Sequence, residues 1–261
     1  MGGCMSDIEY FDTAEGIRIA YRFRAGDGPA IVFLPGYMSD MDGGKATAIL
    51  AWAERSGRAC LLLDYSGCGH SEGEFAERSL TDWRDEVLAL IEAKIDGPVL
   101  LVGSSMGGWL MLLAGLVLGA GDPGRLAGLV GIASAPDFTE WGFSAGEKVT
   151  IRDDGVLNRQ LSGAYRGETM PTWRRFWQSG QQSRLLGKPI AIDCPVRLLH
   201  GQRDTDVPWK TSLRLAEALR SDDIQVTLIK DGDHRLSREG DIALLLATIG
   251  ALSRQDPVSC P

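Results

Sequence analysis

Short apolar runs recur along the chain and alternate with stretches of helical spacing. The first run, residues 17–24 (IRIAYRFR), alternates apolar and polar side chains, which is typical of a half-exposed antiparallel strand. The later runs are apolar throughout, which favours strands buried on both faces, as in a parallel sheet. They are residues 30–34, 59–64, 99–103, 127–133, 196–200 and 224–229. Helical spacing falls between them, at about 43–55, 79–94, 107–119, 209–220 and 237–252.

The alternation of strands and helices predicts an α/β fold, with a mostly parallel twisted sheet and helices on both faces. It breaks once, from about Asp137 to Asp193, where no convincing strand is visible. Three of the seven tryptophans lie in this stretch, and structureless loops of such length are rare in compact domains. We therefore expect a helical lid at 137–190, inserted into a core formed by 1–136 and 191–261. An ordinary pair of linking helices is the alternative.

Composition narrows the classes of partner. The net charge of −8 argues against nucleic acid, which binds clustered basic surface. The longest apolar run, residues 109–118, has half the length of about 20 residues that a membrane-spanning helix needs. The cysteines are odd in number and scattered, without a C-x-x-C pair, so we expect neither a disulfide framework nor a zinc site. They are Cys4, Cys60, Cys68, Cys194 and Cys260.

A glycine-rich turn follows the apolar run at 99–103. In residues 100–109, LLVGSSMGGW, the pattern G-x-S-x-G fits one register, which makes Ser105 the elbow serine and Ser104 its neighbour. A serine on a sharp strand-to-helix turn leaves no room for side chains two positions away, and Gly103 and Gly107 stand there. The helical run that follows points its N-terminus at the turn and favours negative charge there. A glycine-rich turn without chemistry is the alternative.

A serine nucleophile needs a base and an acid, which in this kind of fold follow it in the order acid, then histidine. Of the three histidines, His70 precedes the serine, and His200 ends a strand, where we expect it to support a turn. His234 follows the last expected strand and is our candidate base. The spacing G-x-x-D-x-x-V-P in residues 201–208 selects Asp204 as the acid, with Asp206 as the alternative.

These residues define roles. Asp204 would fix the tautomer of His234, which would take the proton of Ser105 as that serine attacks a carbonyl. The N–H of Met106 and the N–H of Tyr37, in the loop FLPGYMSD, are the candidate donors of the oxyanion hole. No cluster of His, Cys and Asp has ligand spacing, so we expect no metal and no cofactor.

The ordered motifs resemble the α/β-hydrolase superfamily, and D-x-x-G-x-G-x-S at residues 64–71 (DYSGCGHS) adds to the resemblance. Within it, FLPGYMSDMDGGKA, GSSMGGWLML and CPVRLLHGQRDTDVPW resemble the mitochondrial palmitoyl-protein thioesterases that also cleave acyl glucuronides. The resemblance implies the triad Ser105, Asp204 and His234 and the hydrolysis of S-acyl thioesters or activated acyl esters. The substrate would be a small ester or thioester, or an S-acylated protein.

The start of the chain suggests a location. It shows neither the basic, apolar pattern of a secretion signal nor an Arg-rich transit peptide, so we expect a cytoplasmic protein. MGGCMS matches the lipidation pattern M-G-x-x-x-S, although we favour a disordered start.

Several readings of substrate and function stay open at this level. Aromatic side chains of the expected lid suit an acyl chain. Its arginines are able to meet a carboxylate, although a solvated helix face is the simpler interpretation. They are Arg152, Arg159, Arg166, Arg174, Arg175 and Arg184. The competing functions are a C–C bond hydrolase with the same triad and a non-catalytic ligand receptor on a hydrolase scaffold.

Overall fold

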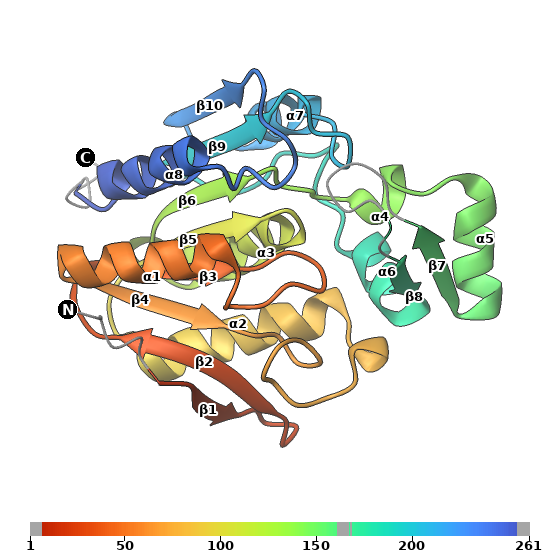
Figure 1. The fold of residues 1–261 in the computed structure, drawn as a ribbon, viewed down its shortest axis with the longest axis horizontal. Helices are drawn as coiled ribbons and strands as arrows, with labels where there is room; N and C mark the ends of the chain where they lie inside the picture. The colour runs from red at the N-terminus through yellow and green to blue at the C-terminus, as the bar shows by residue number, and fades with distance from the viewer. Residues whose placement is uncertain (1–6, 161–166, 168, 255–261) are drawn as a thin grey trace.

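A computed structural model describes residues 7–160, 167 and 169–254. Its main sheet has eight strands in the order β1-β2-β4-β3-β5-β6-β9-β10 (Figure 1). β2 pairs antiparallel with both β1 and β4, and the remaining neighbours pair parallel. The strands are β1 (Glu9–Asp12), β2 (Arg18–Arg24), β3 (Asp27–Leu34), β4 (Arg58–Leu63), β5 (Val99–Ser104), β6 (Leu126–Ile132), β9 (Val196–Gly201) and β10 (Ile224–Ile229). This sheet confirms the expected fold class.

Helices cover both faces of the sheet, as the sequence predicts. They are α1 (Gly44–Ser56), α2 (Leu80–Lys94), α3 (Met106–Gly121), α7 (Lys210–Ala218) and α8 (Glu239–Leu252), with the 3₁₀ turns η1 (Phe75–Glu77) and η2 (Pro123–Arg125). One core cluster joins α1 and α8 to one face, and a second joins α2, α3 and α7 to the other. The central parallel strands β5 and β6 are apolar because both of their faces are buried. β10 was expected to be buried in the same way, but it lies at the edge of the sheet and exposes Gln225 and Thr227.

The described residues of 137–190, here called the insertion, lie beyond the ends toward which the parallel strands point (Figure 1). It holds the helices α4 (Phe138–Trp141), α5 (Ala145–Asp154) and α6 (Arg174–Gln182). It also holds a two-stranded antiparallel sheet, β7 (Val156–Gln160) and β8 (Thr169–Trp173). The expectation that no strand occurs here is therefore wrong. These strands carry no apolar run, and Pro171 lies within β8, which a two-stranded sheet tolerates because both of its strands are edges.

Within the described part of the chain, no helix combines the length and the apolar character that crossing a bilayer requires. Burial raises the pKa of the thiols of Cys60, Cys68 and Cys194 to about 12, which leaves them as unreactive thiols at neutral pH. The N-terminal Met-Gly-Gly-Cys stretch, Cys260 and Arg166 lie outside the described residues.

Candidate active site

The turn between β5 and α3 holds Ser105 in a strained backbone conformation. Its φ of 55° and ψ of −117° fall outside the regions that L-residues usually occupy. The flanking glycines are required by space: a Cβ on Gly103 would lie 2.3 Å from the carbonyl oxygen of Gly107, and a Cβ on Gly107 would lie 2.0 Å from that of Leu34. The steric argument made from the sequence therefore holds at both glycines.

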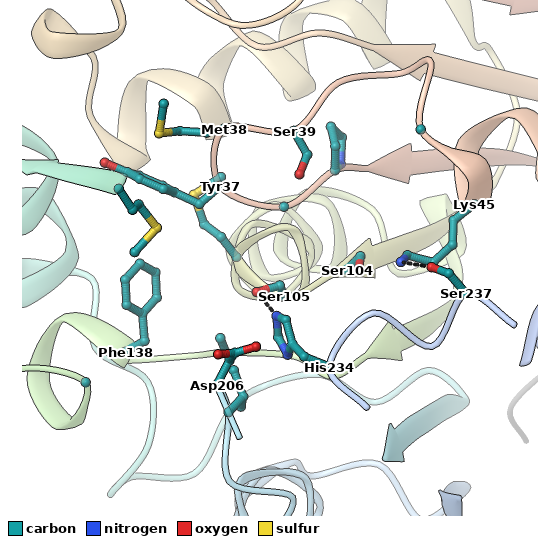
Figure 2. A pocket seen from close by; sticks show the side chains of 18 of the residues that line it. Tyr37, Met38, Ser39, Lys45, Ser104, Ser105, Phe138, Asp206, His234 and Ser237 are labelled. Carbon is teal, nitrogen blue, oxygen red and sulfur yellow. Dashed lines mark hydrogen bonds between the residues drawn. The ribbon is translucent and has the colours of Figure 1, made fainter. Parts of the chain in front are cut away.

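The loop between β10 and α8 brings His234 to this serine. The Nε2 of His234 lies 3.0 Å from the Oγ of Ser105, across 129 residues of sequence (Figure 2). Its Nδ1 lies 2.8 Å from Oδ2 of Asp204, which follows β9. Both side chains are nearly excluded from solvent, with 6% of His234 and none of Asp204 exposed. The three predicted side chains thus form one continuous hydrogen-bonded series.

The Asp204 carboxylate is held from several sides. Its Oδ1 accepts the backbone N–H groups of Asp206 and Val207, at 2.9 Å and 2.8 Å. Burial alone would raise the pKa of Asp204, but hydrogen bonds from His200 and His234 outweigh burial and lower the pKa below its usual range. The carboxyl is therefore ionised throughout the neutral range. Asp206, the alternative acid, lies close to the same imidazole.

The two residues chosen as oxyanion-hole donors come from different elements. Met106 is the first residue of α3, where a helical N–H has no partner within its own helix. Tyr37 belongs to the loop between β3 and α1, and both residues line the cavity that contains Ser105 and His234. A Cβ on Gly36 would meet Ser105 at an ordinary 3.5 Å, so this position does not require glycine for space.

A buried carboxylate fixes the loop that carries Tyr37. Asp64, which begins the D-x-x-G-x-G-x-S motif, accepts the backbone N–H of Met41 at 2.7 Å and that of His70 at 2.8 Å. A Cβ on Gly69 would lie 2.2 Å from the Asp64 carboxylate, which explains a glycine of the motif. The motif thus joins the loop after β4 to the loop after β3.

The cavity around Ser105 has a volume of about 470 Å³ and two kinds of wall. Figure 2 shows Tyr37, Met38 and Phe138 on one side of the Ser105–His234 pair and Lys45, Ser104 and Ser237 on the other. The insertion contributes the apolar side chains of Phe138, Trp141, Phe143 and Met170 to the lining. One wall therefore suits an apolar group, and the other suits polar atoms.

Lys45 and Arg159, the cations among the described residues that line the cavity, already contact other groups. Arg159 contacts Glu147 at 2.8 Å and stacks on Phe143. Lys45, whose pKa is lowered to about 8 mainly by burial, donates to the carbonyl of Arg235 at 2.6 Å. The other described arginines of the insertion contact groups outside the cavity: Arg152 with Asp153, Arg174 with the Asp153 carbonyl, Arg175 with Asp82 and Arg184 with Glu140. This favours the interpretation of these arginines as surface residues.

Among the described residues, Asp204, Asp206 and His234 form a group that could hold a metal ion, with possible ligand atoms within 4.8 Å of one another. Both nitrogens of His234 already face other partners, Nδ1 the Asp204 carboxylate and Nε2 the serine hydroxyl. This geometry fits proton transfer to and from a serine, and a metal would have to displace one of these contacts.

The sequence did not reveal that His200 contacts Asp204. We expected it to support a turn, and its Nε2 does lie 3.1 Å from the carbonyl oxygen of Val207. The same nitrogen also lies 3.1 Å from Oδ2 of Asp204, and Nδ1 lies 2.7 Å from Oγ of Ser212. The spacing His-x-x-x-Asp between residues 200 and 204 was the available signal.

Comparison with known proteins identifies the family. The profile of the alpha/beta hydrolase family matches residues 31–243. The chain belongs to the alpha/beta hydrolase family. This hydrolase is 38% identical to the human palmitoyl-protein thioesterase ABHD10, mitochondrial, in an alignment that covers 95% of this chain and 80% of the human protein. The mouse counterpart is 37% identical in an alignment that covers 95% of this chain and 82% of the mouse protein.

Solved structures agree. The mouse alpha/beta hydrolase domain-containing protein 10 superimposes with a TM-score of 0.86 at 37% identity, covering 95% of this hydrolase and 98% of the mouse chain. A hydrolase from Agrobacterium vitis S4 superimposes with a TM-score of 0.87 at 34% identity, covering 95% and 100%. Est1E from Butyrivibrio proteoclasticus, at 18% identity and a TM-score of 0.75, shares the fold.

The expected location is corrected by these relatives. The sequence suggested a cytoplasmic protein because its start does not show the features of a targeting segment. The curated thioesterases from human, orangutan and mouse to which this hydrolase is similar are all mitochondrial, which contradicts that expectation. Composition near a chain's start is a weak guide to compartment, because a targeting signal is read by a receptor rather than by packing.

Proposed function

We propose that this hydrolase cleaves acyl thioesters or activated esters through a covalent acyl-enzyme. Ser105 is the nucleophile, His234 is the base, and Asp204 is the acidic residue of the triad, whose carboxylate orients His234. The observation that carries the proposal is the contact of 3.0 Å between His234 Nε2 and Ser105 Oγ, continued by the contact of 2.8 Å from Nδ1 to Asp204. A nucleophile, its base and the group that orients the base are then within hydrogen-bond reach of one another.

The reaction would run in two halves. Ser105 Oγ attacks the acyl carbon while its proton passes to His234 Nε2, and the carbonyl oxygen takes the electron pair as an oxyanion. The N–H groups of Met106 and Tyr37 would stabilise that charge, each donor being worth about 3 kcal/mol. Collapse breaks the C–S or C–O bond, and the leaving thiol or alcohol takes the proton from His234. A water molecule, deprotonated by His234, then attacks the acyl carbon. The bond between that carbon and Ser105 Oγ breaks, Oγ takes the proton back from His234, and the carboxylic acid leaves.

The cavity supports an acyl substrate with an apolar chain. In this proposal the insertion forms the wall that holds the chain, through Phe138, Trp141, Phe143 and Met170, and the core supplies the reacting groups. Similarity to thioesterases of the ABHD10 family supports a thioester as the bond that is cleaved, with a thiol as the leaving group. The substrate would then be a small acyl thioester or ester, or an S-acylated protein.

The test is the rate of hydrolysis over a panel of acyl-CoA, S-acyl peptide, p-nitrophenyl ester and acyl glucuronide substrates, measured for the wild-type protein and Ser105→Ala. We expect turnover of thioesters and activated esters, reduced by at least about 10⁴-fold in Ser105→Ala. Binding of these compounds without turnover would support the receptor instead. Cleavage of a C–C substrate with no esterase activity would support the C–C bond hydrolase.

A further inference from the structure

A second imidazole meets the same oxygen of Asp204 that His234 meets. His200, at the end of β9, is fully buried and places Nε2 3.1 Å from Oδ2 of Asp204. Behind it, its Nδ1 lies 2.7 Å from the hydroxyl of Ser212 on α7. Asp204 thus stands between two hydroxyl–imidazole pairs: His234 with Ser105 toward the cavity, and His200 with Ser212 toward the interior.

The partners of His200 fix where its proton resides. Nε2 faces two groups that only accept, the ionised Asp204 carboxylate and the carbonyl oxygen of Val207 at 3.1 Å, so Nε2 carries the proton and donates. In a neutral ring Nδ1 is then an acceptor, and the Ser212 hydroxyl donates to it. Ser212 is 1% exposed, so its hydroxyl has little access to solvent.

Charge balance favours the neutral ring. During the reaction His234 becomes an imidazolium, and the negative charge of Asp204 compensates this positive charge. A second imidazolium at His200 would place two positive rings on the one Oδ2 atom of Asp204, which is costly in an interior of low polarity. A neutral His200 donates a hydrogen bond to Asp204 and leaves its negative charge available to His234.

We propose that His200, supported by Ser212, is a positioning residue that holds the Oδ2 atom of Asp204 in line with His234; this inference rests on the proposed function. It acts through Asp204 and touches neither substrate nor Ser105. The backbone N–H groups of Asp206 and Val207 hold Oδ1, and His200 holds Oδ2, so the carboxylate plane is fixed at both oxygens. The same Nε2 contact closes the turn from Asp204 to Val207.

Substituting His200 by glutamine or asparagine distinguishes the contribution of Nε2 from that of Nδ1. The side-chain nitrogen of glutamine falls near the position of Nε2, whereas that of asparagine falls near Nδ1. We expect kcat of His200→Gln to stay within about 3-fold of wild type, and kcat of His200→Asn and His200→Leu to fall about 10- to 100-fold, by analogy with groups that orient a ligand or catalytic side chain from behind. KM should change less than 2-fold in all three, because His200 does not contact the substrate.

Rates are to be normalised to the fraction of chains that react with a fluorophosphonate probe, so that misfolded protein does not enter kcat. Ser212→Ala, which changes little volume, is the variant for the case in which His200→Leu does not fold. It should lower kcat about 2- to 10-fold, since a single hydrogen bond is lost. Equal kcat in His200→Gln, His200→Asn and His200→Leu, or a loss that appears only in KM, would overturn the positioning role.

A readout independent of activity is available because the chain has three histidines. In ¹⁵N-histidine-labelled protein, assigned with His70→Gln and His200→Gln, we expect the proton of His200 to lie on Nε2. Ser212→Ala should shift the Nδ1 resonance of His200 and leave Nε2 protonated. A proton on Nδ1 would contradict the inference, whether Nε2 is protonated or not.

The outcomes separate this inference from the proposed function. If the wild-type protein hydrolyses esters and His200→Leu matches it per active site, the positioning role is wrong and the proposed function stands. If the wild-type protein hydrolyses none of the substrates and does not react with the probe, the proposed function fails and the positioning role fails with it, even where the tautomer of His200 is as expected.

Discussion

The core and the insertion contribute different kinds of side chain to one cavity. Core loops bring Ser105, His234 and Asp204, which are held by hydrogen bonds of 2.8 to 3.0 Å and by backbone N–H groups. The insertion brings Phe138 and Met170, which offer apolar area. Hydrogen bonds fix positions to tenths of an ångström, whereas apolar contact depends mainly on area. In the function proposed above, the core would set the reaction and the insertion would set the choice of acyl chain.

The largest expected effect lies in the core. Asp204→Asn should lower kcat by about 10³- to 10⁴-fold for every acyl chain length, because His234 loses the partner that fixes its tautomer and stabilises its charge. Asp206→Asn should lower kcat less than about 10-fold. Steady-state kinetics on acetyl and palmitoyl thioesters measures both variants. An unchanged Asp204→Asn beside an inactive Asp206→Asn would reverse the assignment of the acid.

A carboxylate in the core and one in the insertion should change the stability of the fold in opposite directions as pH rises. Burial raises the pKa of Glu86 in α2 to about 7, so the native state binds more protons than the unfolded chain between about 4.5 and 7, and Glu86 destabilises the fold as pH rises through this window. In the insertion, a hydrogen bond from the Ser144 backbone lowers the pKa of Glu147, which contributes stability above its usual pKa and loses it as pH falls.

Glu86→Gln sharpens this contrast. Urea unfolding should show the variant gaining about 1 to 3 kcal/mol of stability relative to wild type between pH 5 and pH 8, because the wild-type carboxyl ionises in that interval and the amide does not. Glu147→Gln is the matched control in the insertion. Parallel stability curves for wild type and Glu86→Gln over this range would show that the buried carboxyl does not titrate there.

Removing apolar area from the insertion should act on long acyl chains alone. Met170→Ala should lower kcat/KM for palmitoyl thioesters about 10-fold and leave acetyl thioesters within 2-fold, because loss of a few buried carbons costs about 1 to 2 kcal/mol. Val149→Ala, on the exposed face of α5, is the control and should change neither rate. Equal losses for both chain lengths would remove the division of labour between the two regions.

The smallest expected effect concerns the joint between the regions. The hydroxyl of Tyr37, in a core loop, donates to the carbonyl oxygen of Pro171 in β8 at 2.9 Å, and burial raises the pKa of Tyr37. Tyr37→Phe should cost about 1 kcal/mol of stability and keep the ring contacts. Thermal unfolding measures this loss, and hydrogen exchange should show faster opening of β8 in particular. Faster exchange across the whole sheet would contradict a local joint.

Sequence predicted the core far better than the insertion, for physical reasons. Strands buried on both faces need apolar side chains throughout, so β5 and β6 are visible as runs of such residues. β1 (EYFD) and β8 (TMPTW) are edge or two-stranded elements without that need, and neither was expected. The same limit hid the contact of His200 with Ser212, because a hydrogen bond between β9 and α7 leaves no periodic trace in the sequence.

The site also has a part that the sequence predicted well and a part that it left open. The glycines around Ser105 are required by contacts within one turn, so a local pattern reveals them. Which of two nearby carboxylates contacts His234 depends on the path of the loop after β9, and spacing alone left Asp206 as an alternative. The structure places the Asp204 carboxylate at 2.8 Å from His234. The identity of the acid in the reaction remains a prediction that the two asparagine variants test.

The most direct test of the account is the site of a covalent label. A fluorophosphonate probe is to be reacted with the wild-type protein and Ser105→Ala, followed by intact mass and peptide mapping. We predict one adduct per chain on Ser105 and no adduct in Ser105→Ala at the same exposure. An adduct on another side chain that persists in Ser105→Ala, or ester hydrolysis that continues in that variant, would contradict the account.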